Sequence, residues 1–298
     1  MPTAHNHQPR LPRCASVRQV GRHIPSAPSR ILDAPELVDD YYLNLISWGS
    51  MNVLAVALGQ CVYLWNAANG NIDHLLTLDG ADDYVTSVSW AGGQGCGHYL
   101  AVGTNSGATQ LWDAKELKLV RTMGGHTQRV GSLAWNKNWL SSGGRDGIIV
   151  QHDVRSANHT AAVYSGHKQE VCGLAWNDDG GQLASGGNEN YLCLWDASMS
   201  RRRSGVDGGA GAVAPRLTLS QHCAAVKALA WCPFHRGLLA SGGGTADRTI
   251  KVRAYQDREA GRGDGATYEA AAHVSNSFTP LARPVRGRSS GIRRPAPS

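Results

Sequence analysis

The sequence contains no long hydrophobic run. No stretch approaches the roughly 18 uninterrupted apolar residues that a membrane-spanning helix requires. The N-terminal segment MPTAHNHQPRLPRCASVRQV also lacks the apolar core of a secretory signal peptide. We therefore expect a chain that has no membrane partner.

Paired cysteines are lacking as well. The seven cysteines form no C-x-x-C pair and show no Cys/His spacing typical of a metal site. Cys61, Cys172 and Cys193 lie in expected strands, where a free thiol behaves as a small hydrophobe. An odd number of scattered cysteines favours a reducing compartment. We expect the nucleus and cytoplasm, and neither a metal nor a cofactor.

Acidic residues are absent from residues 1–30, which hold five arginines. Residues 254–298 hold seven arginines against four acids, so the net charge of +6 belongs to the two ends. The middle of the chain, residues 31–253, comes to −2. A nucleic-acid-binding protein typically carries its basic patch on the folded part, among aromatic residues. We therefore expect no nucleic-acid partner.

The stretch from Gly166 to Asp196 shows the pattern that the rest of the chain repeats. Three apolar runs, Val171–Trp176, Gln182–Ser185 and Tyr191–Trp195, are separated by turns of Gly, Asn and Asp. Such runs predict antiparallel strands joined by tight hairpins. A unit that opens on Gly-His and closes on Trp-Asp is typical of a WD-repeat propeller blade.

The polar residues of this unit predict a chain of hydrogen bonds. His167 can bond across the unit to a strand hydroxyl, expected to be Ser185, and a turn acid and the indole of Trp195 can extend the chain. Glu189 stands where this repeat more often carries aspartate. His167 could instead be a catalytic base or a metal ligand, but its place at the head of a repeat favours the structural role.

Five units align on their first tryptophans, Trp48, Trp90, Trp135, Trp176 and Trp231. The successive spacings are 42, 45, 41 and 55 residues, and all but the last fall near the roughly 40–45-residue period of propeller blades. The long interval is explained by a Gly- and Arg-rich insertion, 201–215, expected to be a flexible loop between the third and fourth strands of its blade. We place the blades near residues 41–79, 84–123, 129–165, 170–219 and 225–253.

A second anchor closes each unit. It is Trp-Asn or Trp-Asp in three of the first four units and His152-Asp153 in the third, while Arg253 replaces the tryptophan in the fifth. The side chains expected to hold the blades together are His126, His167, His222, Ser185, Asp146, Asp247, Trp112 and Trp195.

These units predict an all-β fold, a WD-repeat β-propeller over residues 30–253 with about five recognisable blades. Residues 1–29 and 254–298 are expected to be disordered because of their composition. No fourth strand of the fifth blade is recognisable after Arg253. An arc with a ragged last blade would leave unpaired strand edges and apolar blade faces in water.

Several segments resemble one family in particular. They are 31–37 (ILDAPEL), 40–45 (DYYLNL), 53–65 (VLAVALGQCVYLW), 129–136 (RVGSLAWN), 169–176 (QEVCGLAW), 184–190 (ASGGNEN), 225–231 (AVKALAW) and 239–248 (LASGGGTADR). The chain resembles the Fizzy and Fizzy-related proteins over about residues 22–252. The resemblance implies a seven-bladed propeller, and a substrate-recruiting coactivator of the anaphase-promoting complex, a ubiquitin ligase. It also implies three kinds of partner, namely subunits of that complex, degron-bearing substrates such as cyclins, and spindle-checkpoint proteins.

The resemblance also implies where degron peptides bind. The KEN-box site of the family lies on the top face, and the matching positions here are Asn188, Asn190 and Thr245. Amides and a hydroxyl suit a polar peptide because each can donate and accept hydrogen bonds. The alternative is that Asn188 and Asn190 merely permit a turn. The D-box groove of the family uses an acid just before the first tryptophan, and Ser47 stands there instead.

The chain departs from the family elsewhere. The C box and the C-terminal Ile-Arg tail have no counterpart, and Arg22-His23-Ile24-Pro25 is interpreted as the pre-propeller Arg-x-Ile-Pro of the family. The pattern changes abruptly at Arg253, inside an expected strand. The hypothesis that follows is a truncated or mis-spliced product unable to activate the ligase.

Two other function classes are open at this stage. A generic WD-repeat scaffold in another complex would bind partners that have neither degron. An enzyme is not expected, because the chain has no G-x-S-x-G elbow, Walker loop or H-E-x-x-H pair. The histidines that a propeller hydrolase would use, His126, His167 and His222, each head a repeat.

Overall fold

The computed structural model describes residues 25–92, 95–198 and 212–255, together with the backbone of 269–273 and 281–282. The chain divides into two units, Met1–Ala34 and Pro35–Ser298. Of the first unit, residues 25–34 are described and form no strand. The two ends that we predict to be disordered lie mostly outside the described residues.

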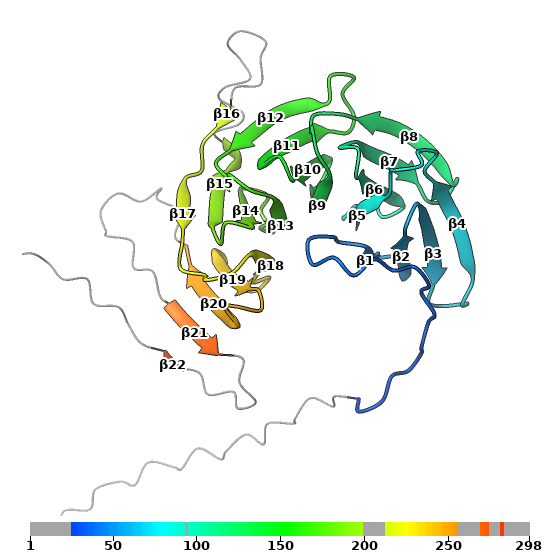
Figure 1. Ribbon diagram of the computed structural model, residues 1–298. Coiled ribbons are helices and arrows are strands. Elements are labelled where there is room, and N and C mark those ends of the chain that lie inside the picture. The colour runs from blue at the N-terminus through cyan, green and yellow to red at the C-terminus, as the bar shows by residue number, and fades with distance from the viewer. Residues whose placement is uncertain (1–24, 93–94, 199–211, 256–268, 274–280, 283–298) are drawn as a thin grey trace, which may run out of the picture. The chain divides into compact units, whose positions relative to one another are not determined.

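The described strands of the second unit form five sheets of mainly antiparallel strands, and each sheet is one propeller blade (Figure 1). Blade 1 contains β1 (Ile46–Trp48), β2 (Val53–Leu58), β3 (Cys61–Asn66) and β4 (Ile72–Thr77). Blade 2 contains β5 (Val85–Trp90), β6 (Tyr99–Thr104), β7 (Thr109–Asp113) and β8 (Lys118–Met123). Blade 3 contains β9 (Val130–Asn136), β10 (Trp139–Gly144), β11 (Ile148–Asp153) and β12 (Thr160–Ser165).

Blade 4 contains β13 (Val171–Trp176), β14 (Gln182–Gly187), β15 (Leu192–Asp196) and β17 (Leu217–Leu219). The predicted insertion therefore lies between its third and fourth strands. At the end of that insertion, β16 (Ala212–Val213) pairs in parallel with β12 and extends blade 3. Blade 5 contains β18 (Val226–Trp231), β19 (Leu238–Gly243), β20 (Thr249–Ala254), β21 (Glu269–His273) and β22 (Leu281–Ala282).

The fifth blade differs from the sequence expectation, which had no fourth strand there. The β21 backbone pairs antiparallel with β20, from Thr249 opposite His273 to Arg253 opposite Glu269. The segment EAAAH has few strand formers, so its sequence gives no sign of a strand. The strand forms because its backbone pairs with the free edge of β20, although its side chains have little preference for a strand.

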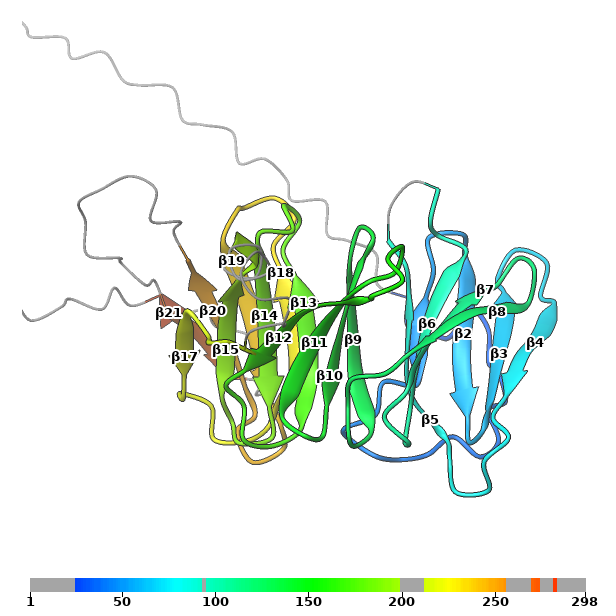
Figure 2. The same ribbon diagram turned by 90° about the horizontal axis from the view of Figure 1, so that it is seen from above.

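The blades follow one another with their first strands side by side, as contacts of β9 with β5 and β13, and of β13 with β18, show (Figure 2). Between blades 4 and 5 the two backbones meet so closely that a Cβ at Gly186 would lie 1.9 Å from the Val226 carbonyl oxygen. Glycine is required there because the neighbouring strand occupies the space of any side chain.

Each hydrophobic cluster lies between one blade and the next. Leu64 and Val88 belong to the cluster of blades 1 and 2, Leu111 and Leu140 to that of blades 2 and 3. The two remaining clusters join blade 3 to 4 and blade 4 to 5. A blade is therefore stabilised by its neighbours, since a single sheet cannot bury both of its faces.

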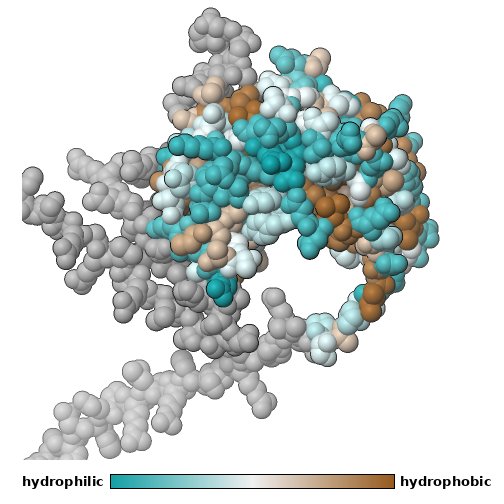
Figure 3. Space-filling model, viewed as in Figure 1, coloured by the Kyte–Doolittle hydropathy of each residue, from teal (hydrophilic) through white to brown (hydrophobic). Residues whose placement is uncertain are grey.

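The two end blades are less well covered than the middle ones. On β1, Ile46 is 55% exposed and Trp48 is 59% exposed. Every residue of the corresponding strands β5, β9 and β13 is buried or partly buried, whereas β18 alternates between partly buried and exposed positions after the buried Val226. The face shown in Figure 3 is mostly hydrophilic over the middle blades. Within the described residues, no helix has the length and apolarity needed to cross a membrane.

Candidate functional site

In blade 4, four side chains form a buried hydrogen-bonded chain. His167 Nε2 lies 2.7 Å from Ser185 Oγ, and Trp195 Nε1 donates to the same hydroxyl at 2.7 Å. His167 Nδ1 is paired with Glu189. Burial alone would lower the pKa of His167, but its contacts with Cys193 and Glu189 raise that pKa to about 9. The glutamate therefore takes the place of the more usual aspartate. Its Oε2 accepts from the Gln169 backbone N–H at 3.2 Å, which ties the β14–β15 turn to the segment before β13.

Blade 3 uses a second histidine where the repeat has tryptophan. His126 lies between Asp146, 3.2 Å away, and Ser142 Oγ, 2.8 Å away. His152 Nε2 is 2.8 Å from the same hydroxyl, and His152 Nδ1 is 2.9 Å from His159 Nδ1. Burial, followed by the nearby His159, lowers the pKa of His152 to about 3. His152 is therefore neutral and takes the position of the indole.

Blade 5 repeats the arrangement with an arginine. His222 Nε2 lies 2.8 Å from Ser241 Oγ, and its Nδ1 lies 2.5 Å from Asp247 Oδ2. Arg253 is 3% exposed and donates to Ser241 Oγ at 3.1 Å. Blade 2 departs further, since Trp112 Nε1 donates to Gln110 Oε1 at 2.8 Å. These polar groups all have structural partners, which weakens any catalytic interpretation of them.

Before blade 1, the chain passes over the rims of several other blades. We call Asp40–Leu45 the crossing segment. Tyr42 donates its hydroxyl to Asn188 Oδ1 at 2.6 Å, and Lys227 Nζ donates to the carbonyls of Tyr41 and Leu43 at 2.6 and 2.7 Å. Asn44 Nδ2 donates to the Gly131 carbonyl at 2.7 Å. The crossing segment thus contacts the loops or first strands of blades 3, 4 and 5.

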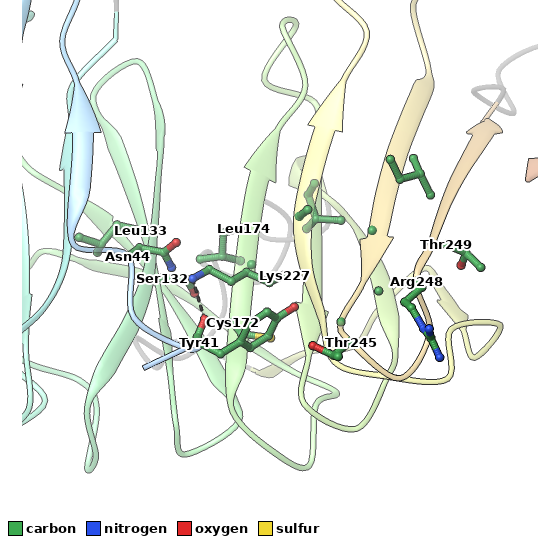
Figure 4. A pocket seen from close by; sticks show the side chains of 17 residues that line it. Tyr41, Asn44, Ser132, Leu133, Cys172, Leu174, Lys227, Thr245, Arg248 and Thr249 are labelled. Atoms are coloured by element: carbon green, nitrogen blue, oxygen red, sulfur yellow. Dashed lines mark hydrogen bonds between the residues drawn. The ribbon is translucent and has the colours of Figure 1, made fainter. Parts of the chain in front are cut away.

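A cavity of about 860 Å³ opens beside the crossing segment (Figure 4). Its lining includes Tyr41 and Lys227, and also Thr245 and Arg248 from the β19–β20 turn. None of the described residues that line it is a carboxylate. Burial lowers the pKa of Lys227, while burial raises the pKa of the Cys172 thiol to about 12. The cavity therefore offers cations and hydroxyls to a polar ligand.

The three residues predicted for the KEN-box site lie on two turns. Thr245 lies in the cavity lining, while Asn188 and Asn190 lie on the β14–β15 turn and outside that lining. Asn188 accepts from Tyr42 and donates from Nδ2 to Gln169 Oε1 at 2.6 Å. Asn190 has φ 70°, in the left-handed region that asparagine tolerates. Asn190 therefore has a turn role as well, and its peptide role stays a prediction.

Ser47 lies on β1 and contacts blade 2. Its hydroxyl accepts from the Trp90 backbone N–H at 3.2 Å, and its carbonyl accepts from the Trp90 indole at 3.0 Å. The side chain is thus engaged on the opposite side of the strand from Trp48. The D-box role of this position stays a prediction.

The crossing segment and the turns of blades 4 and 5 together form a polar rim. The predicted site contained no residue of the crossing segment. Tyr41 and Tyr42 reach blades 5 and 4, and Lys227 reaches back to Tyr41 and Leu43. The sequence feature that could have indicated this contact is the pair of adjacent tyrosines just before the first blade. Among the described residues, no cluster of three or more His, Cys, Asp or Glu side chains could hold a metal ion.

Known proteins similar in sequence to this chain carry Cdc20 and Fizzy-related names. The chain is 53% identical over 240 residues to an anaphase-promoting complex subunit cdc20 from Dictyostelium discoideum, covering 80% of this chain and 46% of that protein. It is 50% identical to the protein FIZZY-RELATED 2 from Arabidopsis thaliana, covering 77% of this chain and 44% of the relative. The chain therefore spans about half the length of the curated relatives it matches.

A solved structure, the crystal structure of a mitotic checkpoint complex, contains a chain with the same fold. The TM-score is 0.70 at 36% identity, and the match covers 94% of this chain and 88% of that one. The predicted all-β WD-repeat propeller is therefore confirmed. The family model of the CDC20/Fizzy WD40 domain matches residues 32–264. The chain belongs to the CDC20/Fizzy family of WD-repeat proteins.

Proposed function

We propose that this chain is the degron-binding propeller part of a coactivator of the anaphase-promoting complex. It would bind short KEN-box peptides of substrates on the rim formed by the crossing segment and the turns of blades 4 and 5. The observation that supports this most directly is the polar rim itself. Tyr42 and Asn188 are hydrogen-bonded to each other there, and Thr245 lines the cavity beside Tyr41.

The chemistry of the rim suits an extended polar peptide. Amide and hydroxyl groups both donate and accept, so they can pair with a peptide backbone and with Asn or Glu side chains. Arg248, together with Lys227 that holds the crossing segment, would place positive charge beside a carboxylate of a bound peptide. Because Tyr42 and Asn188 are already bonded to each other, little ordering is required when a peptide binds.

The relatives support a proposal about partners. Proteins similar to this chain are named as a subunit or a cofactor of the anaphase-promoting complex, and the matched structure is a mitotic checkpoint complex. We propose the same classes of partner here: subunits of the ligase, degron-bearing substrates such as cyclins, and checkpoint proteins. In this role the chain is an adaptor and performs no chemistry of its own.

The proposed location is the nucleus and cytoplasm. Six cysteines among the described residues carry free thiols, which supports a reducing compartment. Imaging of the tagged chain through the cell cycle tests this. Accumulation in the secretory pathway would contradict it.

A peptide titration tests the function. A labelled KEN-box peptide is titrated with the full chain and followed by fluorescence anisotropy, with a scrambled peptide as the reference. We expect binding of the KEN peptide alone, weakened about tenfold or more in Asn188→Ala and in Thr245→Ala, since each substitution removes a polar group from the rim. The matched control is Asn158→Ala, an exposed asparagine of the β11–β12 loop.

Equal affinity for the scrambled peptide would favour the generic scaffold instead. The same conclusion would follow if neither rim variant lost affinity.

A further inference from the structure

A buried arginine joins the crossing segment to two blades. Arg129 binds Glu170 through two parallel bonds, Nε to Oε1 at 2.8 Å and Nη2 to Oε2 at 2.9 Å. Its third nitrogen, Nη1, donates to Asp40 Oδ2 at 2.8 Å. Arg129 directly precedes β9 of blade 3, and Glu170 directly precedes β13 of blade 4. One guanidinium therefore ties both blades to the crossing segment.

The three charges are shielded from water to different degrees. The side chains of Arg129, Glu170 and Asp40 are 10%, 7% and 29% exposed. Hydrogen bonding to Glu170 raises the pKa of Arg129 further above its usual range. Burial opposes ionisation of Asp40, but the Tyr42 N–H and Arg129 together lower its pKa. Removing one partner of such a group leaves the others without their counter-charge.

Tyr42 connects this ion cluster to the proposed peptide site. Its N–H donates to Asp40 Oδ1 at 2.8 Å, and its ring centre lies 5.8 Å from Arg129 Cζ. Its hydroxyl donates to Asn188, whose own backbone N–H donates to the Glu170 carbonyl at 2.9 Å. The contacts form a closed loop from Glu170 through Arg129, Asp40, Tyr42 and Asn188 back to Glu170.

We propose that Arg129 is a positioning residue for peptide binding. It is buried beneath the rim, and it sets where Tyr42 and Asn188 stand by holding Asp40 and Glu170 together. The peptide part of this inference rests on the proposed function. A rim that is fixed before the peptide arrives binds more tightly, because ordering it on binding would cost affinity.

Two variants separate this role from simple stability. Asp40→Asn keeps the shape of the side chain and leaves the Arg129–Glu170 bonds between blades 3 and 4 intact. Arg129→Lys keeps the charge but loses the planar fork that reaches both carboxylates. The matched control is Asp39→Asn, which removes the same charge from an exposed neighbour.

Two readouts are measured on the full chain. Amide hydrogen exchange of Leu43 and Asn44 reports on the crossing segment, since their N–H groups donate to Asp40 O at 3.1 Å and Thr86 O at 3.1 Å. Anisotropy titration reports on the KEN-box peptide. We expect exchange about tenfold faster, and affinity about tenfold weaker, in both variants, with strand amides and Asp39→Asn unchanged.

The outcomes are separable. Unchanged exchange at Leu43 and Asn44 in Asp40→Asn, the variant that spares the blade pair, would overturn the role of Arg129 in holding the segment. Faster exchange with unchanged peptide affinity would overturn the positioning role. Failure of the unaltered chain to bind the peptide would overturn the proposed function, while the exchange data would still decide whether the ion cluster fixes the segment.

Discussion

Arg253 donates from Nη1 to Ser241 Oγ at 3.1 Å, in the position where the repeat has a tryptophan indole. In blade 4 the corresponding donor is Trp195, 2.7 Å from Ser185 Oγ. The blade requires a buried N–H donor at this point, and a guanidinium supplies one. The abrupt change of sequence at Arg253 is therefore compatible with a formed fifth blade.

The shared serine of blade 4 predicts a large effect on stability. Ser185→Ala removes the hydroxyl that joins His167 to Trp195 and leaves two buried nitrogens without that partner. We expect the free energy of unfolding to fall by about 2–3 kcal/mol. Urea unfolding followed by tryptophan fluorescence measures this. The control is Ser165→Ala, at an exposed position of β12; equal midpoints for the two variants would contradict the prediction.

The close approach of blades 4 and 5 predicts that Gly186 tolerates no side chain. A methyl group at Gly186 would meet the Val226 carbonyl oxygen, so the two strands must move apart. We expect Gly186→Ala to lower the free energy of unfolding by about 3 kcal/mol. Gly181→Ala is the matched control, because a Cβ there has no atom within 4 Å. A thermal midpoint that is the same in both variants would show that the blades are not packed as described.

The buried His152 predicts a loss of stability in acid. Burial, helped by the nearby His159 imidazole, holds its pKa at about 3 in the folded chain, against an ordinary 6.5. Between these values the unfolded chain binds the extra proton, so this contribution is complete above pH 6.5 and is lost as the pH falls toward 3. We expect His152→Trp to flatten the decline, measured as urea midpoints at several pH values. Parallel curves for the two proteins would argue against a neutral buried imidazole.

The exposed strand of blade 1 predicts concentration-dependent association. Ile46 and Trp48 both lie more than half exposed on β1. Apolar side chains on an uncovered sheet face favour contact with another surface. We expect Trp48→Gln to shift the sedimentation profile toward the monomer without lowering the free energy of unfolding by more than about 1 kcal/mol. Phe234→Gln, at a loop residue that is 96% exposed, is the control. A profile that responds equally to both changes would count against a specific role for the blade face.

Local periodicity predicted much of this protein. Strand length, hairpin turns and the spacing of His, Ser and Trp within a unit depend on residues close together in the chain, so each blade could be read from its own sequence. The chain of His167, Ser185, Glu189 and Trp195 spans one unit, and its members are related by strand register alone. The family resemblance followed from the same segments.

The rim across the blades was decided only by the tertiary structure. Tyr42 and Asn188 are separated by 146 residues, and Arg129 and Asp40 by 89. Whether they meet depends on the angle between successive blades and on the path of the crossing segment. No repeating pattern in the sequence reports on either feature. The β21 strand was missed for a related reason. It forms because the edge of β20 offers unpaired backbone groups, and its own side chains do not indicate a strand. The sequence by itself determined the blades, and the packing of the blades determined which side chains stand together above them.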